Sequence, residues 1–467
     1  MIFNLLDEKW IPVLWNNGTV SRVGIRGALT QAHRIRQIAA SNPMDRVAII
    51  RFLLALLYWC KGNPPTDKVT SSSESFSVEW FSKLDNNKDC FNLLGEGKRF
   101  YQCHAVEPIS DKDKNHEIIP LIQEIPNGDD KWHFRHSTDK VNGLCRACCA
   151  HGLLRLPIFT SGEGRGWHQG INGTPPIYIM PMGTTLLETL VLNWKAVEDI
   201  GEPVWVQPVI QMGNIPFLTG MTLLARRVWL HDPIEVATCI ACGSRRTPII
   251  KTCEYQSSGP SRNNHWNDPH VLYFMTKKND RASVRADDLT VAGKFRMDRP
   301  WSRLLSHVAK KGNSTSNGKS APLFIIGFAT DKAKNVDVWE RTILNLPENL
   351  TEEIDTACQQ WGQAGQQLEK KIGRAEQEGK ATIASIRPHV ETIVSAKAGE
   401  LLAGGGAAWE KAAEEYRPMM EVIANSLSPG FTTAALKRRR DIANTLPDMK
   451  PKSEPVKKPA KKKGESK

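Results

Sequence analysis

Residues 144–149 have the sequence LCRACC and residues 238–246 have the sequence TCIACGSRR, so the chain carries two Cys-x-x-Cys pairs. Zinc favours four thiolate ligands in a tetrahedron, and a Cys-x-x-Cys turn offers two sulfurs to one ion. The pairs lie 94 residues apart (145 to 239), so only the tertiary fold can join them. We therefore predict one structural zinc ion, and its four ligands are Cys145, Cys148, Cys239 and Cys242.

Other roles for these sulfurs stay open at this point. Cys149 is an alternative ligand to Cys148, and the cysteines could also be buried thiols without a metal, or redox or catalytic groups. A catalytic zinc keeps a coordination position for water, which four thiolates would fill. The spacing therefore favours a structural site over a catalytic one.

Enzyme motifs are not matched. A zinc deaminase carries His-x-Glu followed by Pro-Cys-x-x-Cys, but here His104 and Glu107 are one residue too far apart and Leu144 precedes the first cysteine. The sequence also lacks a Walker A loop, a His-Glu-x-x-His helix and a Gly-x-Ser-x-Gly elbow. We predict that the chain is not an enzyme, with a zinc-dependent nucleic-acid-modifying enzyme such as a deaminase as the alternative.

Composition indicates a globular cytoplasmic protein. The 467 residues are 40% hydrophobic and 24% charged, which suffices for two or three domains with their own cores. No run approaches the roughly 18 apolar residues of a membrane span, and the N-terminus does not resemble a signal peptide. The ten cysteines are therefore expected to be reduced, and no membrane partner is expected.

The net charge of +12 favours a polyanionic partner, because lysine and arginine displace counterions from phosphates. Residues 449–467 contain eight Lys and two Glu, which accounts for +6 of that charge. This Pro- and Lys-rich segment is typical of a disordered tail. The remaining charge includes local clusters such as Arg226-Arg227 and Arg438-Arg439-Arg440.

The hydrophobic pattern predicts an α+β protein. Residues 1–345 form a large mixed domain with the zinc site, with a buried helix over 47–59, buried strands over 176–182 and 322–328, and an exposed loop over 256–270. Helical spacing of Ala, Glu, Gln, Lys and Leu over 346–447 predicts a C-terminal antiparallel helix bundle, followed by a disordered basic tail over 448–467.

Two segments have the composition of nucleic-acid contacts. Residues 161–170 (SGEGRGWHQG) carry alternate glycines, which let backbone amides approach a phosphate or a groove wall. Residues 131–136 (KWHFRH) interleave aromatic and basic side chains. A plain surface loop is the alternative for the glycine segment.

The order of these features resembles the CasA family, the large subunit of the type I-E CRISPR Cascade surveillance complex. The opening NLLDEKWIPV over 4–13 is similar to that family's start. The likeness continues through the first cysteine pair, the glycine segment ending in Gly173-Thr174-Pro175, the second cysteine pair and the stretch from Trp266 to His270.

The resemblance implies a non-enzymatic DNA-recognition subunit. Such a subunit reads the protospacer-adjacent motif in duplex DNA largely from the minor groove, aids strand opening and R-loop formation, and recruits a separate helicase-nuclease. Its partners would be double-stranded target DNA, the guide-RNA-containing Cascade subunits and that helicase-nuclease. A CRISPR-unrelated zinc-containing scaffold is a further alternative.

The resemblance also implies DNA-binding residues. Phe134 and His136 match the loop that contacts the adjacent motif, although the family usually has Asn at the second position. The family's minor-groove lysine falls near Ser257, so Lys251 and Arg262 are the candidates for that role. The family's minor-groove glycine loop matches Gly162, Gly164, Arg165 and Gly166. Its polar strand-splitting wedge should lie between 329 and 336, where the candidates are Lys332, Lys334 and Asn335.

Overall fold

The computed structural model of the protein describes residues 3–65, 75–123, 143–161, 166–206, 215–258, 266–271, 273–275, 281–283, 322–331, 335–343 and 431–443. The chain divides into two compact units, which are treated separately. Unit 1 comprises Met1–Val291 and Arg303–Asn349, and unit 2 comprises Ala292–Ser302 and Leu350–Lys467. The domain boundaries expected from the sequence stay a prediction.

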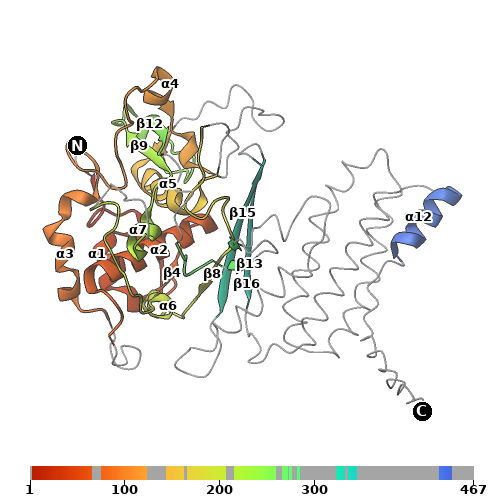
Figure 1. Ribbon diagram of the computed structural model, residues 1–467, viewed down its shortest axis with the longest axis horizontal. Helices are drawn as coiled ribbons and strands as arrows, with labels where there is room; N and C mark the ends of the chain where they lie inside the picture. The colour runs from red at the N-terminus through yellow and green to blue at the C-terminus, as the bar shows by residue number, and fades with distance from the viewer. Residues whose placement is uncertain are drawn as a thin grey trace, which may run out of the picture. The chain divides into compact units, whose positions relative to one another are not determined.

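Helix α2 (Pro43–Lys61) is buried over most of its length, and all its residues from 47 to 59 are buried. It begins where the Asn42 side chain accepts a hydrogen bond from the backbone N–H of Met44, with a proline in the first turn. Three further helices pack against it in Figure 1, and they are α5 (Arg146–Phe159), α6 (Leu186–Asn193) and α7 (Phe217–Thr222). The predicted buried helix is confirmed.

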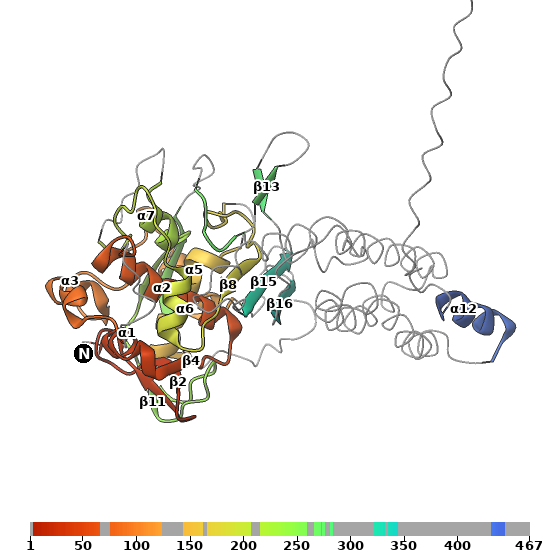
Figure 2. The same cartoon turned by 90° about the horizontal axis from the view of Figure 1, so that it is seen from below.

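A three-stranded antiparallel sheet has the order β16-β15-β8. Strand β15 (Leu323–Asp331) pairs on one side with β8 (Tyr178–Pro181) and on the other with β16 (Asn335–Ile343). The hairpin of β15 and β16 is visible in both views (Figure 1 and Figure 2). The strands predicted over 176–182 and 322–328 are confirmed as β8 and β15. They pair with each other although they lie far apart in the sequence.

Two small sheets support the candidate sites. The first has the order β10-β11-β7, with β10 (Glu235–Ala237), β11 (Thr247–Ile250) and β7 (Leu144–Cys145). The second has the order β6-β12-β9, with β6 (His116–Glu117), β12 (Thr252–Ser257) and β9 (Arg226–Leu230). All neighbours in both sheets are antiparallel.

The remaining described elements of unit 1 are short. Its other sheets have the orders β3-β2-β4, β1-β5 and β13-β14. Their strands are β1 (Phe3–Asn4), β2 (Ile11–Trp15), β3 (Val20–Val23), β4 (Ile35–Ile38), β5 (Asn92–Leu94), β13 (Tyr273–Met275) and β14 (Arg281–Ser283). The other helices are α1 (Ile25–Thr30), α3 (Ser82–Asn86), α4 (Asp111–Lys114), and the 3-10 turns η1 (Ala32–Arg34), η2 (Val78–Phe81), η3 (Lys88–Phe91) and η4 (Ile119–Leu121).

In unit 2 the described residues are 431–443, which contain α12 (Thr433–Ala443). The Thr432 hydroxyl accepts a hydrogen bond from the backbone N–H of Ala435 at 3.2 Å, as a helix N-cap does. The rest of the expected helix bundle, and the basic tail, lie outside the described residues. The mixture of helices and sheets expected for the chain is confirmed in unit 1.

Candidate metal centre and nucleic-acid interface

The β10-β11-β7 sheet brings the two Cys-x-x-Cys pairs together. The second pair lies in the connection from β10 to β11, and the first pair lies where β7 runs into α5. Cys145 is directly opposite Ile249 in the pairing of β7 with β11. Antiparallel pairing therefore joins two pieces of chain that are remote in sequence.

The four sulfurs form one cluster. The Sγ atoms of Cys145, Cys148, Cys239 and Cys242 all lie within 4.8 Å of one another, and the Sγ atoms of Cys145 and Cys242 are 3.7 Å apart. A tetrahedral zinc with Zn–S bonds near 2.3 Å would separate its sulfurs by about 3.8 Å. The donor set and spacing fit a structural zinc ion.

Cys149 does not belong to this cluster. It is fully buried in α5, where its Sγ lies 4.0 Å from the carbonyl oxygen of Leu144. Burial raises the pKa of the Cys149 thiol well above its ordinary value. Of the two neighbouring cysteines, Cys148 is therefore the one placed to bind a metal.

Glycines allow the chain to turn tightly around the cluster. Gly243 has a φ of +68° and its N–H donates to the carbonyl oxygen of Cys239 at 2.9 Å. Gly143 has a φ of +106°, and a Cβ there would lie 2.3 Å from the Ile249 side chain. These conformations favour glycine because a Cβ would be strained or would collide.

The four thiols differ in acidity. Hydrogen bonds with Cys145 and then Cys148 lower the pKa of Cys239 from 9.0 to about 6. Hydrogen bonds with the same two residues also lower the pKa of Cys242, whereas the hydrogen bond with Cys145 raises the pKa of Cys148. The four thiols therefore interact strongly with one another, and metal binding requires their thiolate form.

The structure describes both ends of the glycine loop. Gly166 has a φ of +88°, a backbone conformation that is strained for residues other than glycine. No described neighbour would collide with a Cβ at this position, so the backbone conformation alone favours glycine. Ser161 and His168 flank the loop on the two sides and are themselves held by hydrogen bonds. Three predicted loop residues lie outside the described residues, and they are Gly162, Gly164 and Arg165.

Ser257, where the family's lysine was expected, ends β12 and lies next to this loop. Its hydroxyl accepts a hydrogen bond from the backbone N–H of His168 at 3.2 Å. Lys251 lies just before the other end of β12, about 20 Å away at the strand rise per residue. There its ammonium forms an ion pair with Glu235 at 2.9 Å.

Asn335 is the first residue of β16 and pairs with Asp331, the last residue of β15. Of the predicted wedge residues, Asn335 thus lies at the end of this strand pair, and Lys332 and Lys334 lie outside the described residues. Phe134, His136 and Arg262 also lie outside the described residues. Their predicted DNA contacts stay predictions.

A buried polar network, which the sequence analysis missed, involves the stretch from Trp266 to His270. The expectation of an exposed loop over 256–270 was wrong for this stretch, because Trp266 is 7%, Asp268 3% and His270 2% exposed. Both carboxylate oxygens of Asp268 accept hydrogen bonds from Arg51 of α2, at 2.7 and 2.8 Å. The polar residues are buried because an arginine of another element neutralises the carboxylate.

His270 extends the network to α6. Its Nδ1 accepts from Arg51 at 2.6 Å, and its Nε2 lies 3.1 Å from the Asn193 Oδ1. Asn172 also donates to Asp268, at 3.0 Å, from the segment that follows the glycine loop. The network thus joins α2, α6, the 266–271 segment and the chain leaving the glycine loop.

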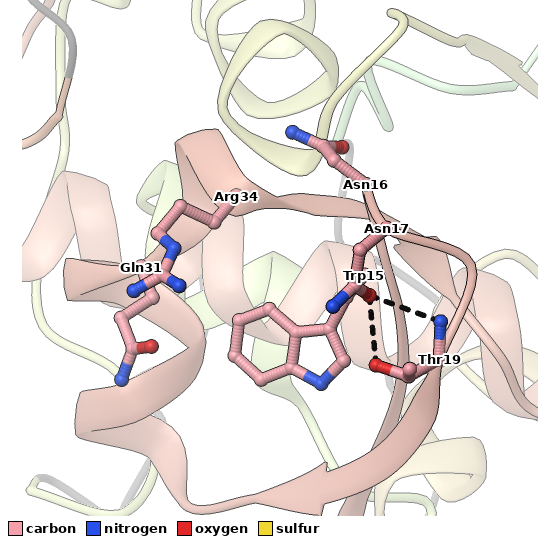
Figure 3. Close-up of a pocket in the computed structure, with 6 residues that line it drawn as sticks. All are labelled: Trp15, Asn16, Asn17, Thr19, Gln31 and Arg34. Atoms are coloured by element: carbon pink, nitrogen blue, oxygen red, sulfur yellow. Dashed lines mark hydrogen bonds between the residues drawn. The ribbon is translucent and has the colours of Figure 1, made fainter.

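A surface hollow of about 380 Å³ lies beside the β3-β2-β4 sheet. Figure 3 shows the residues that line it, and they are Trp15, Asn16, Asn17, Thr19, Gln31 and Arg34. The Asn17 Oδ1 accepts from the N–H and the hydroxyl of Thr19, at 3.0 and 2.8 Å. The described lining offers amides, a hydroxyl, an indole and a guanidinium, and none of these groups suits general acid–base catalysis near neutral pH.

The part of the chain that the structure describes has no helix that is both long and apolar enough to cross a membrane.

Solved structures share this fold. The crystal structure of Thermus thermophilus CasA matches with a TM-score of 0.68 at 20% identity, covering 96% of this chain and 99% of that chain. Thermobifida fusca Cse1 matches with a TM-score of 0.63 at 18% identity, covering 96% and 98%. A chain of a CRISPR RNA-guided surveillance complex matches with a TM-score of 0.63 at 16% identity, covering 95% and 99%. The fold is therefore that of the CasA proteins.

Sequence comparison identifies the family. The family described as CRISPR-associated protein Cse1 matches residues 4–446. The CasA/Cse1 protein of Thermus thermophilus is 26% identical over 462 residues, covering 91% of this chain and 83% of the relative. The chain belongs to the Cse1 family, which is the CasA family of the large Cascade subunit named from the sequence.

Proposed function

We propose that this chain is the DNA-recognition subunit of a type I-E Cascade-like complex. The observation that carries the proposal is the family match, which spans residues 4–446. In this role the chain reads the protospacer-adjacent motif of double-stranded DNA, largely from the minor groove. It then aids strand opening and R-loop formation, and it recruits a separate helicase-nuclease. Base pairing with the guide RNA reads the remaining target sequence.

The proposed complex defines the partners. The chain assembles in the cytoplasm with the guide-RNA-containing Cascade subunits, and its fold likeness to a chain of a CRISPR RNA-guided surveillance complex supports this assignment. The mixed domain over 1–345 reads the motif, and the helical region over 346–447 contacts neighbouring subunits and the displaced strand. The basic cluster on α12, Arg438-Arg439-Arg440, lies in that region.

The four-cysteine cluster supports a structural zinc ion as the cofactor. Cys145, Cys148, Cys239 and Cys242 would hold it, and the metal would supply a rigid tetrahedral joint between the two chain segments. A site with four thiolates has no position left for water. This favours a non-catalytic subunit over the deaminase alternative.

The loops provide the DNA contacts in this proposal. Phe134 and His136 contact the motif-bearing duplex, and the glycine loop from Gly162 to Gly166 enters the minor groove, where its glycines let the backbone approach the groove wall closely. Arg165 adds a guanidinium to that loop. Lys251 and Arg262 are the candidates for the further basic contact, and Lys251 would have to leave its ion pair with Glu235 to make it.

The hairpin of β15 and β16 carries the proposed wedge. Its two strands stay paired up to Asp331 and Asn335, the residues that flank the proposed wedge positions in the sequence. Unstacking a base step of the duplex costs a few kcal/mol, and a polar wedge would keep the separated bases from stacking again. Lys332, Lys334 and Asn335 are the residues for this role.

The test is target binding by the complex reconstituted with this chain and a guide RNA. Duplexes with a matching target and randomised adjacent bases should be bound selectively, and the selected bases define the motif. Phe134→Ala should weaken binding to the selected duplex by about 1 to 3 kcal/mol, the scale of a lost specific contact. The recognition role would be contradicted if Phe134→Ala weakened binding to random duplex equally. It would also be contradicted if the complex bound duplexes with all adjacent base sequences equally well.

A further inference from the structure

Arg226 is a buried charge that the proposed DNA contacts do not use. It lies on β9 with 0% exposure, while its neighbour Arg227 is half-buried, because successive residues of a strand point to opposite faces. The sequence pair Arg226-Arg227 is typical of a basic patch, but a fully buried guanidinium cannot contact a phosphate. Arg226 therefore has another role.

Its guanidinium holds both ends of the glycine loop. Nη2 donates to the carbonyl oxygen of Ser161 at 2.8 Å, and Nη1 donates to the carbonyl oxygen of His168 at 2.5 Å. Ser161 directly precedes the loop from Gly162 to Gly166, and His168 follows it by two residues. One side chain thus fixes the distance between Ser161, where the chain enters the loop, and His168, after the chain has left it.

The surrounding contacts make Arg226 rigid. Its Nε donates to the Tyr255 hydroxyl at 3.2 Å, and its guanidinium lies 5.0 Å from the centroid of the Trp167 ring. Trp167 in turn stacks on Tyr255 with centroids 5.5 Å apart and an interplanar angle of 27°. On the other side of the same peptide segment, the Ser257 hydroxyl accepts from the N–H of His168.

From this geometry we infer that Arg226 is a positioning residue that presets the glycine loop for motif reading. The inference rests on the proposed function. A loop whose ends are fixed loses less conformational entropy on binding, so more of its contact energy appears as specific affinity. Arginine suits this role because its planar fork donates in two directions at once, which a lysine ammonium on a flexible stem does not reproduce.

The test uses the full chain in the reconstituted complex. Arg226→Lys keeps the charge and removes the fork, and Arg227→Met changes the neighbouring arginine on the opposite face. We expect Arg226→Lys to reduce discrimination between motif-bearing and motif-altered duplexes by about tenfold. Arg227→Met should keep that discrimination even if overall affinity falls. The salt dependence of binding should stay unchanged for Arg226→Lys, because no phosphate contact is lost.

A double-variant cycle separates positioning from a general loss of structure. Gly164→Val alters the loop itself, and if Arg226 acts through the loop, adding Arg226→Lys to Gly164→Val should cause little further loss. Additive losses, or full discrimination by folded Arg226→Lys, would overturn the inference. If Gly164→Val itself has no effect, the proposed DNA-reading function fails first.

Ser257→Ala provides a second variant in case Arg226→Lys does not fold. It removes the acceptor for the His168 N–H and leaves the buried guanidinium in place. A reduced discrimination, smaller in extent than the loss caused by Gly164→Val, supports the role of the held loop ends. Unchanged discrimination in Ser257→Ala, with Arg226→Lys unfolded, would count against the inference.

Discussion

Two groups of side chains join distant segments of unit 1, and they differ in what joins them. The four-cysteine cluster brings residues 145 and 148 next to 239 and 242, with sulfurs spaced for a shared metal. The buried network joins Arg51 of α2 directly to Asp268 and His270, without any other group between them. The first group is suited to hold an added ion, whereas the second is held by a buried ion pair and hydrogen bonds.

The two joints should therefore respond to different conditions. A metal joint is lost when the ion is removed or when its thiolates take up protons. A buried ion pair is insensitive to chelators, but removal of one partner leaves a charge in the core.

Loss of the zinc joint should have the largest effect. Zinc binding can contribute on the order of 10 kcal/mol to folding of a zinc-dependent structure, so Cys145→Ser or a strong chelator should open the β10-β11-β7 sheet and lower the melting temperature. Metal analysis should find one zinc per chain before treatment. Cys149→Ala is the matched control, and it should keep the zinc because its sulfur lies outside the cluster. Unchanged melting of the metal-free protein would refute a structural role.

Removal of the buried carboxylate should have the next largest effect. Asp268→Ala leaves the Arg51 guanidinium buried without its two-point partner, which should lower the free energy of unfolding by about 3 to 5 kcal/mol. The zinc content should be unchanged, as chemical denaturation and metal analysis can show. The control is Glu235→Gln, which breaks the ion pair of Glu235 (41% exposed) with Lys251 (32% exposed). This change should lower the free energy of unfolding by less than about 1 kcal/mol, because exposed ion pairs contribute little. Equal costs for the two variants would contradict this view of the network.

A smaller effect should be a loss of folding stability at acidic pH that is caused by His151. This imidazole is buried in α5, and burial lowers its pKa although the Asp45 carboxylate, 3.6 Å away, acts in the opposite direction. Arg155 faces the same carboxylate at 2.5 Å and also disfavours a second positive charge. Below about pH 6.5 the unfolded chain binds a proton that the folded chain does not, so stability should fall as the pH falls.

The measurement is denaturant unfolding at about pH 7.5 and at about pH 5.5, with a slope of at most about 1.4 kcal/mol per pH unit from this group. His151→Gln can still donate to the carbonyl oxygen of Trp10, which lies 3.1 Å from the imidazole Nε2. That variant should show a flatter pH dependence than the unchanged chain. An identical slope in both would exclude His151 as the source.

The four-cysteine cluster was predictable from the sequence and the buried network was not. Two Cys-x-x-Cys pairs indicate a shared ion by residue type and spacing alone, although the choice of Cys148 over Cys149 required the direction of α5. Asp268 and His270 stand in a polar stretch whose composition is typical of an exposed loop. Their burial follows from Arg51, a residue more than two hundred positions earlier in the chain.

The glycine loop shows the same division. Its glycines and the adjacent tryptophan were visible as a motif, and Gly166 has the positive φ that calls for glycine. Arg226, which holds its ends, was counted from the sequence among the local basic clusters, because sequence alone does not show which face of β9 is covered. The burial of Trp266 likewise became visible only in the structure, where a Cβ on Gly220 would lie 2.2 Å from its ring.

Local patterns in the sequence were enough to predict helix α2, the strands β8 and β15, the residues of the four-cysteine cluster and the resemblance to a family. Each of these is a pattern of hydrophobicity, residue type or order along the chain. The tertiary structure was needed to show that the cysteine pairs meet, that Arg51 meets Asp268, and that Arg226 holds the ends of the glycine loop. These contacts join segments remote in sequence, and their energies depend on burial, which a local pattern does not specify.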